Sequence, residues 1–223
     1  MKSPKIINIA ALITSLFLNI PSSLAEKLPL VILKKRCDNC HGFDLRSKKN
    51  LAPNLRYAGE KFQSKWLESY LKKPEIIRPS GYILSPKFLE GNPPDQHLEV
   101  SVKEAKIITN YLMTLKVNSN DSPIIFETLP ENNMEKTKIK FERNFGCTSC
   151  HQSINLVGKA RGGVSGPSLV NAGNRLNPAW IYRWLKNPST YEIKSRMPIF
   201  KITEETSIEL VKYIMTLKRE NLK

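Results

Sequence analysis

The chain lacks the features that would place it in several common classes of protein. Beyond residue 25 it has no apolar run of ~20 residues, so we expect no membrane helix in the body of the chain. Aromatic residues make up only 8% of the sequence and do not interleave with a basic patch, which excludes a nucleic-acid-binding surface. The excess of 35 basic over 20 acidic residues is instead spread along the chain, and it predicts attraction to acidic patches on partner proteins.

The sequence also has no stretch that alternates between apolar and polar residues over the length of a strand. Apolar residues recur at helical spacing instead, so we predict an all-α fold. First helices are expected at about residues 29–40 and 135–149. A later helix begins at Ser101, where Glu104 three residues on predicts a capping box, and another begins with Asn177 as its N-cap.

The N-terminal segment has the pattern of a targeting sequence. A positively charged end precedes an apolar run over residues 6–20, and a region of small residues follows and ends at Ala25. We interpret residues 1–25 as a signal peptide and expect the mature chain to begin at Glu26 in the periplasm. An uncleaved N-terminal membrane anchor is the alternative interpretation.

Histidine and cysteine are scarce, with three and four residues, yet nearly all of them fall in two short motifs. Each motif has two cysteines three positions apart and a histidine directly after the second cysteine. The motif residues are Cys37, Cys40 and His41 in the first, and Cys147, Cys150 and His151 in the second. This pattern is the attachment site of c-type haem, in which the thiols form thioethers with the porphyrin and the histidine binds the iron. The sequence therefore predicts two covalently bound haem c groups.

Other interpretations of the cysteine pairs fit less well. A structural zinc site usually has roughly 15–20 residues between its two pairs, whereas here more than a hundred intervene. A redox-active pair of the thioredoxin kind needs a βαβ setting, which the sequence does not suggest. Disulfides are possible in an oxidising compartment, but they do not explain why a histidine follows both pairs.

The chain has the pattern of two copies of one unit, related by a constant offset of 114 residues. Matching pairs are Pro53 and Pro167, Leu55 and Leu169, Gly59 and Gly173, Trp66 and Trp180, and Pro74 and Pro188. We therefore divide the chain into the signal peptide (1–25), a first domain (26–117), a linker (118–134) and a second domain (135–223).

Both copies resemble class I c-type cytochrome domains, and together they are similar to tandem dihaem cytochromes of the bacterial periplasm. The resemblance covers nearly the whole chain after the signal peptide. It implies two tandem small helical domains, each built around a covalent haem. It also implies that the carbonyls of Pro53 and Pro167 accept hydrogen bonds from the Nδ1 atoms of His41 and His151. The side chains implied to contact haem are Leu55 and Leu169 on its face and Trp66 and Trp180 near its edge.

Such a domain needs a second axial ligand to the iron, usually a methionine just before a proline in the loop that precedes the last helix. The second copy has Met197 before Pro198, and we predict that Met197 binds the second iron. Met215 is the alternative, but Met113 matches it in the first copy, and both are better interpreted as helix packing.

The first copy has no methionine in that loop, because Ser85 stands where Met197 stands. A ten-residue insertion in this loop contains His97, the only histidine outside the two motifs, and we predict that His97 binds the first iron. Three alternatives remain for this site: a solvated loop histidine with five-coordinate iron, ligation by Lys87, or ligation by Tyr82.

These features predict a periplasmic electron carrier with two unequal haems, rather than an enzyme. One alternative is a dihaem enzyme whose first haem acts on a sulfur compound or on peroxide. The layout is similar to thiosulfate dehydrogenases, but those use a cysteine as distal ligand, and this chain has none to spare. Another alternative is an electron-transfer subunit of a membrane-associated dehydrogenase or oxidase complex.

Overall fold

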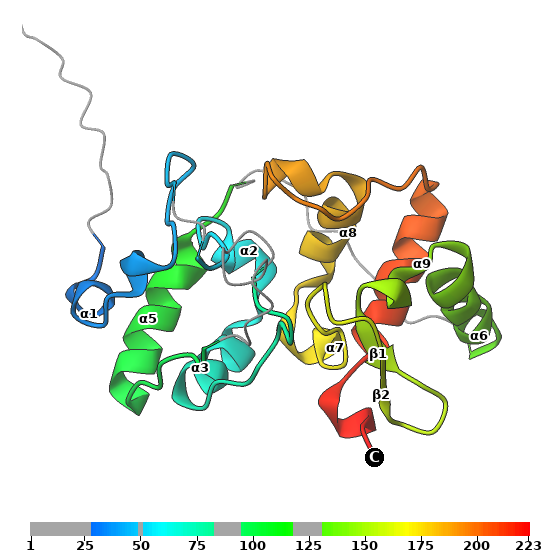
Figure 1. Cartoon of the computed structure of the whole chain (residues 1–223), viewed down its shortest axis with the longest axis horizontal. Coiled ribbons are helices and arrows are strands. Elements are labelled where there is room, and N and C mark those ends of the chain that lie inside the picture. The colour runs from blue at the N-terminus through cyan, green and yellow to red at the C-terminus, as the bar shows by residue number, and fades with distance from the viewer. Residues whose placement is uncertain (1–27, 49–50, 83–94, 118–130) are drawn as a thin grey trace, which may run out of the picture.

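The computed structural model describes residues 28–48, 51–82, 95–117 and 131–223 (Figure 1). The predicted signal peptide, Ser85, Lys87 and nearly all of the predicted linker lie outside the described residues. We call residues 28–117 the N-terminal half and residues 131–223 the C-terminal half. Within the described ranges, no helix is both long and apolar enough to cross a membrane.

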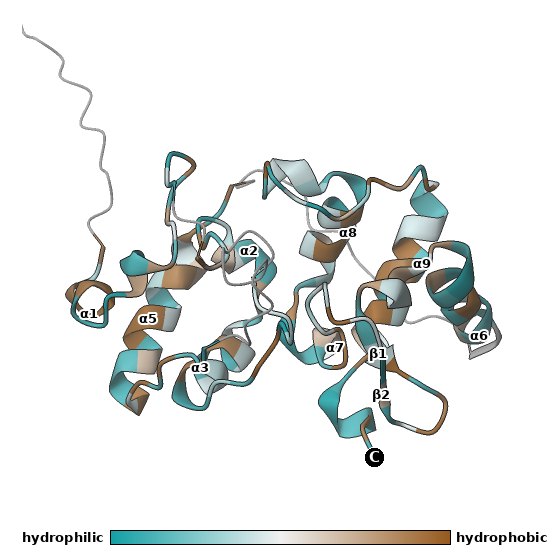
Figure 2. Cartoon of the chain, in the orientation of Figure 1, coloured by the Kyte–Doolittle hydropathy of each residue, from teal (hydrophilic) through white to brown (hydrophobic). Residues whose placement is uncertain are grey.

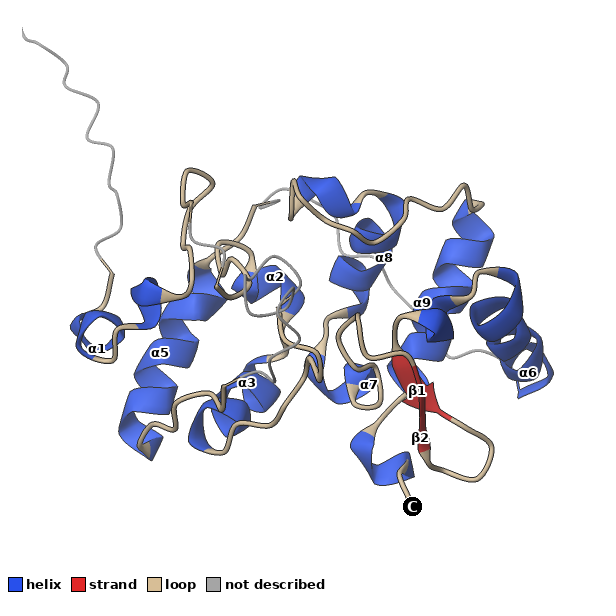
Figure 3. Cartoon of the chain, in the orientation of Figure 1, coloured by secondary structure: helices blue, strands red, loops and turns tan. Residues whose placement is uncertain are grey.

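Helices dominate both halves (Figure 3). The N-terminal half contains α1 (Leu30–Lys34), a 3-10 turn (Cys37–Asn39), α2 (Ala58–Lys61), α3 (Ser64–Lys72) and α5 (Val102–Thr114). The C-terminal half contains α6 (Glu131–Ile139), a π-helical turn (Lys140–Asn144), a 3-10 turn (Cys147–Ser149), β1 (Gln152–Ile154), β2 (Ala160–Gly162), α7 (Ala172–Arg175), α8 (Pro178–Lys186), a 3-10 turn (Pro188–Thr190), α9 (Glu204–Thr216) and a final 3-10 turn (Arg219–Asn221).

The helices of the two halves correspond one to one where the sequence repeat is strongest. The bounds of α2 and α7 differ by 114 residues at both ends, and so do those of α3 and α8, which carry the two tryptophans of the repeat. The last helices, α5 and α9, both have 13 residues. In each half a glycine, Gly59 or Gly173, lets the short second helix approach the backbone of the last helix closely, because a Cβ there would overlap a carbonyl oxygen.

The start of α5 confirms the predicted capping box. The Ser101 hydroxyl accepts a hydrogen bond from the backbone N–H of Glu104, and the Glu104 carboxylate accepts one from the backbone N–H of Ser101. In α9 the hydroxyl of Thr203 accepts a hydrogen bond from the backbone N–H of Thr206 at 3.2 Å. These contacts satisfy N–H groups that the first turn of a helix leaves without partners.

The predicted first helices, 29–40 and 135–149, are wrong in their continuity. In each half the helix ends before the motif, and one residue in the left-handed region redirects the chain into a 3-10 turn that holds the cysteines. That residue is Arg36 with φ of 57° in the N-terminal half and Gly146 with φ of 59° in the C-terminal half. Helical periodicity continues across both breaks, so the apolar pattern alone does not reveal them.

A short β-hairpin follows the second motif and was not predicted. Strands β1 and β2 pair antiparallel over three residues each, with Ser153 opposite Arg161. Three residues are too few to give a readable alternation, and β2 is exposed along its whole length, so no apolar face marks it. The rest of the described chain is helix and loop, in keeping with the predicted helical class.

Buried apolar side chains form two clusters, and brown segments line the inner faces of the helices in Figure 2. The cluster of the N-terminal half contains Ile108 and Leu112, which α5 presents on one face as the sequence predicts. The cluster of the C-terminal half includes one residue of the other half, Tyr57. Its ring stacks on Trp180 at an interplanar angle of 8° and meets Tyr191 edge-on at 5.2 Å between centroids.

The two halves join through reciprocal backbone contacts at equivalent positions. Residues 61–63 run antiparallel to residues 175–177, and Phe62 pairs with Leu176 in an isolated β-bridge. The last residue of each segment donates its backbone N–H to the carbonyl of the first residue of the other, at 2.9 Å in both directions. Because equivalent residues exchange the same bonds, the halves are related locally by a pseudo-twofold axis through this bridge.

Side chains strengthen the same junction. Asn177 donates from Nδ2 to two backbone carbonyls of the N-terminal half, at 2.7 and 3.0 Å. Gln63, its equivalent, donates from Nε2 to two carbonyls of the C-terminal half, both at 2.9 Å. Asn177 does hold the N-cap position of α8, but its side chain makes no capping hydrogen bond, because its amide is committed to the other half.

The buried carboxylate of Glu60 makes polar contacts between the halves. Glu60 is only 6% exposed, accepts a hydrogen bond from the hydroxyl of Tyr191 at 3.0 Å and lies 3.5 Å from the guanidinium of Arg183. Nearby, Arg56 donates to the carbonyls of Thr190 and Tyr191, both at 2.9 Å. The relative placement of the halves is therefore fixed by many directional contacts.

Candidate functional site

The two motifs adopt the same backbone turn. In the first, the N–H groups of Cys40 and His41 both donate to the carbonyl of Cys37, at 3.3 and 2.9 Å. In the second, the corresponding bonds to the carbonyl of Cys147 measure 3.3 and 3.0 Å. This turn places two thiols and an imidazole on consecutive positions of one compact loop.

All four cysteines are free thiols, so neither pair is a disulfide. The second cysteine of each motif is exposed, and the first is half-buried. Burial raises the pKa of the Cys147 thiol to about 11 and raises that of Cys37 in the same direction. Each motif therefore presents two free thiols that line a pocket.

Each motif histidine is oriented by a proline carbonyl, as the family resemblance implies. The Nδ1 atom of His41 lies 2.7 Å from the carbonyl oxygen of Pro53, and that of His151 lies 2.8 Å from the carbonyl oxygen of Pro167. Burial lowers the pKa of His41 to about 4 and also lowers that of His151. A neutral imidazole that donates through Nδ1 keeps the Nε2 lone pair for a metal ion.

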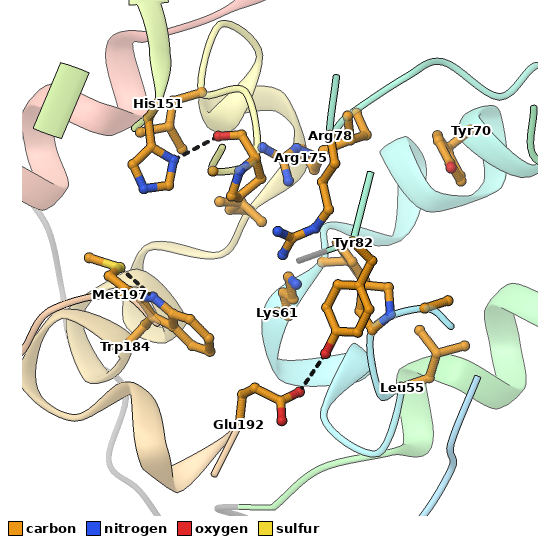
Figure 4. A pocket seen from close by; sticks show the side chains of 18 of the residues that line it. Leu55, Lys61, Tyr70, Arg78, Tyr82, His151, Arg175, Trp184, Glu192 and Met197 are labelled. Atoms are coloured by element: carbon orange, nitrogen blue, oxygen red, sulfur yellow. Dashed lines mark hydrogen bonds between the residues drawn. The ribbon is translucent and has the colours of Figure 1, made fainter. Parts of the chain in front are cut away.

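A single large pocket brings both motifs together. It has a volume of about 1210 Å³, above the ~300–1,000 Å³ that is usual for the site of one small ligand. The predicted contact residues Leu55, Leu169, Trp66 and Trp180 all line it, as do both motif histidines. Figure 4 shows the part of this pocket where the two halves meet.

Met197 lines the same pocket as His151, and Figure 4 shows the two side chains one below the other at the same side of the view. The indole Nε1 of Trp184 donates to its sulfur at 2.8 Å, which holds the thioether in place. Met197 and the rival methionine, Met215, both pack against the apolar cluster of the C-terminal half, and Met113 packs against that of the other half. Of these two methionines, only Met197 lines the pocket as the structure describes it, and its assignment as a distal ligand stays a prediction.

His97 lies beside His41, although 55 residues separate them in the sequence. The centroids of the two imidazole rings are 6.1 Å apart, and the ring planes make an angle of 50°. The Nδ1 atom of His97 lies 3.0 Å from the carbonyl oxygen of Leu98, which leaves its Nε2 available. Both imidazoles thus use Nδ1 for the backbone and line the same pocket.

Two aromatic residues that the sequence analysis did not identify support the distal side chains. The ring of Tyr70 lies 5.4 Å from that of His97, and Trp184 binds the sulfur of Met197. Tyr70 and Trp184 are equivalent under the offset of 114, since each follows the repeat tryptophan by one helical turn. That spacing was the available signal, because residues four apart share one helix face.

Tyr82 and Lys87 are the alternatives to His97 as ligand of the first iron. The hydroxyl of Tyr82 donates to the Glu192 carboxylate at 2.9 Å, and burial is the main cause of its raised pKa, so it is held as a neutral phenol away from a metal. Lys87 lies outside the described residues.

The residues present fit a covalently bound haem in each half. The thiols are free, each motif imidazole keeps its Nε2, and apolar side chains line the cavity. The buried indole nitrogen of Trp180 has no hydrogen-bond partner among the described residues, as expected for a donor that faces a missing polar group.

Residues 30–116 match the family model described as Cytochrome c. The matched segment begins at α1, contains the first motif and ends just beyond α5; it does not include the C-terminal half. No curated protein and no solved structure matches the chain.

Proposed function

We propose, from the match of residues 30–116 to the Cytochrome c family model, that the chain is a periplasmic dihaem c-type cytochrome that transfers electrons between redox proteins. The C-terminal half is then a second cytochrome c domain, and each half binds one covalent haem c. The proposed attachment residues and proximal ligands are Cys37, Cys40 and His41, and Cys147, Cys150 and His151.

One observation carries the proposal of a second haem: the C-terminal half repeats the contacts of the matched half. The histidine–proline hydrogen bonds differ by only 0.1 Å, at 2.7 and 2.8 Å. The N–H of Gly59 donates to the carbonyl of Leu115 at 2.9 Å, and the N–H of Gly173 donates to that of Leu217 at 2.9 Å. A shared fold that preserves the same haem-attachment residues favours the same cofactor.

For the C-terminal half we propose His151 and Met197 as the two axial ligands. A thioether on one side favours ferrous iron and raises the reduction potential. The hydrogen bond from Trp184 orients the sulfur, as outer contacts commonly do for metal ligands.

For the N-terminal half we propose His41 and His97. Two imidazoles that bind one metal ion from opposite sides, at the ~2.0–2.1 Å measured for zinc, have centroids about 6 Å apart. The observed separation of 6.1 Å agrees with this geometry. Bis-imidazole ligation gives a low-spin haem with a lower potential than the Met197 haem.

Ligation by His97 also favours an electron carrier over an enzyme. A catalytic haem needs an open or easily opened distal side, and with His97 as ligand an imidazole packed against Tyr70 would occupy that side. The rigid junction of the two halves suits a carrier as well, because it fixes the distance between the haem sites.

We propose that partner proteins dock through acidic patches near the exposed edge of each motif. Cys40 and Cys150 are exposed, and Arg36 beside the first motif is exposed as well. Association with such a partner is expected to slow as ionic strength rises, because exposed charges are screened. A partner within a membrane-associated respiratory complex would show the same salt dependence.

The test is mass spectrometry of the exported protein together with a redox titration of its visible spectrum. We expect a chain that begins at Glu26, carries two haems and titrates with two potentials. A free thiol at Cys147, bound zinc or a single haem would contradict the dihaem proposal. Retention of residues 1–25 in the membrane fraction would contradict release into the periplasm.

A further inference from the structure

Two buried cations occupy equivalent positions in the two halves. Lys61 ends α2 and Arg175 ends α7, and the offset of 114 relates them. Only 9% of Lys61 and 3% of Arg175 are exposed. Both line the shared pocket, between the side that holds His151 and Met197 and the side that holds Leu55 and Tyr82 (Figure 4).

Each of these cations crosses to the other half. The ammonium nitrogen of Lys61 lies 5.0 Å from the ring centroid of Trp180, and the guanidinium carbon of Arg175 lies 5.9 Å from that of Trp66. The crossing follows from the junction, because residues 61–63 and 175–177 run antiparallel and pass each other. Trp66 and Trp180 are the two residues expected near the haem edges.

Among the described residues, no carboxylate forms an ion pair with either cation, although the charge of Glu192 partly offsets that of Lys61 at longer range. The ammonium group of Lys61 makes no hydrogen bond or ion pair in the described part of the chain, and a third cation, Arg78, lines the same pocket. Arg175 donates to the side chain of Asn171 and to the carbonyl of Ser168, both neutral, at 3.2 and 2.6 Å. Burial and the neighbouring arginines lower the pKa of Lys61.

One neutral donor in the same place also lacks a partner. The indole N–H of Trp180 is buried without an acceptor among the described residues, and the ammonium of Lys61 lies over its ring. The carboxylate on this side of the pocket, Glu192, accepts the hydroxyl of Tyr82 instead. Buried cations and an orphan N–H together indicate a site for an anion with oxygen acceptors, since burying unpaired charge is costly.

We propose that Lys61 and Arg175 bind haem carboxylates in a crossed arrangement. Lys61, from the N-terminal half, binds a carboxylate of the haem attached to the C-terminal half, with Trp180 as a second donor. Arg175, from the C-terminal half, binds a carboxylate of the haem attached to the N-terminal half. This inference rests on the proposed dihaem function. Each half then tunes the potential of the haem that the other half carries.

The test measures both potentials in holoprotein variants. Removing a cation beside a haem carboxylate stabilises ferric iron, so Lys61→Met should lower the potential of the haem that shows the methionine–iron band. Arg175→Met should lower the potential of the other haem. We expect at least a tenfold change in the ratio of oxidised to reduced haem at a fixed applied potential, which is about 59 mV for a one-electron couple.

Matched controls separate this effect from loss of charge in general. Lys65 is exposed on α3 and Arg161 is exposed on β2, so Lys65→Met and Arg161→Met change the net charge equally. Both should leave the two potentials unchanged. Lys61→Arg and Arg175→Lys keep the charge, so both potentials should stay close to those of the wild type. That result would also show that the shift in the Met variants comes from loss of charge and not from misfolding.

The outcomes distinguish this inference from the function on which it rests. If the wild type carries fewer than two haems, the proposed function fails. If two haems are present but each variant shifts the haem of its own half, or shifts neither, the crossed arrangement is wrong. If added sulfate or thiosulfate shifts the wild-type potentials and Lys61→Met abolishes that response, the cations bind a free oxyanion, and the inference is also overturned.

Discussion

Replacing His97 with alanine is the most direct test of the unequal ligation that we propose. The structure places the His97 and His41 imidazoles 6.1 Å apart, and two imidazoles on one metal ion require about 6 Å, so ligation needs almost no movement of either ring. Removing the side chain deletes one axial ligand without touching the attachment motif. We expect one of the two haems to change from low-spin to high-spin, while the Met197 haem keeps its spectrum.

The size of the expected change follows from the contacts of the site. His97 is held by Tyr70 at 5.4 Å and by the carbonyl of Leu98 at 3.0 Å, and neither neighbour offers a strong replacement ligand. The vacated position should therefore take up added imidazole and return to the low-spin state. Axial ligands can move haem potentials over a range of about 0.8 V, so the potential of this haem should rise measurably on loss of the imidazole.

Electron paramagnetic resonance and imidazole titration are the assays. Gln96→Ala is the matched control, because Gln96 is the exposed neighbour of His97 and its loss should change neither haem. The reasoning is refuted if wild-type protein already contains a high-spin haem that His97→Ala leaves unchanged. It is also refuted if the variant stays entirely low-spin, because another side chain would then be the ligand.

Three further predictions follow from the site and the junction. Met197→Ala should abolish the methionine–iron absorption band and lower the potential of one haem only, whereas Met215→Ala should leave the band intact, as a visible redox titration will show. Gly59→Ala and Gly173→Ala should each destabilise the holoprotein by about 1–3 kcal/mol in chemical denaturation, because the added methyl group overlaps a carbonyl oxygen of the last helix. Asn177→Ala should cost about 1–3 kcal/mol, because it leaves two buried carbonyls at the junction without a donor, whereas Asn110→Ala on the exposed face of α5 should cost little.

The sequence was most informative where chemistry depends on neighbouring residues. The two motifs, the proline that orients each histidine and the capping box at Ser101 depend on contacts within about fifteen residues, and the structure contains each of these contacts. The tryptophan helices of the two halves also end at equivalent positions, two residues before Pro74 and Pro188, in keeping with the repeat offset.

The sequence was less informative about features set by backbone strain or by contacts between the halves. The break at Arg36 places a non-glycine residue in the left-handed region, which no local pattern marks. The side chain of Asn177 could cap α8, but it donates a hydrogen bond to the other half instead. This contact depends on how the two halves pack together. The positions of Lys61 and Arg175 beside the tryptophans of the opposite halves were not predicted for the same reason. They depend on how the two halves pack together in the folded chain.

The pattern of likeness and difference between the halves bears on the direction of electron flow. The proximal contacts of His41 and His151 are nearly identical, so they do not distinguish two potentials. The differences are on the distal side, where His97 and Tyr70 face one site and Met197 and Trp184 face the other. In the dihaem cytochrome that we propose, we expect this distal chemistry to make the C-terminal haem the better electron acceptor, so that electrons entering at the N-terminal haem would pass to it downhill in energy.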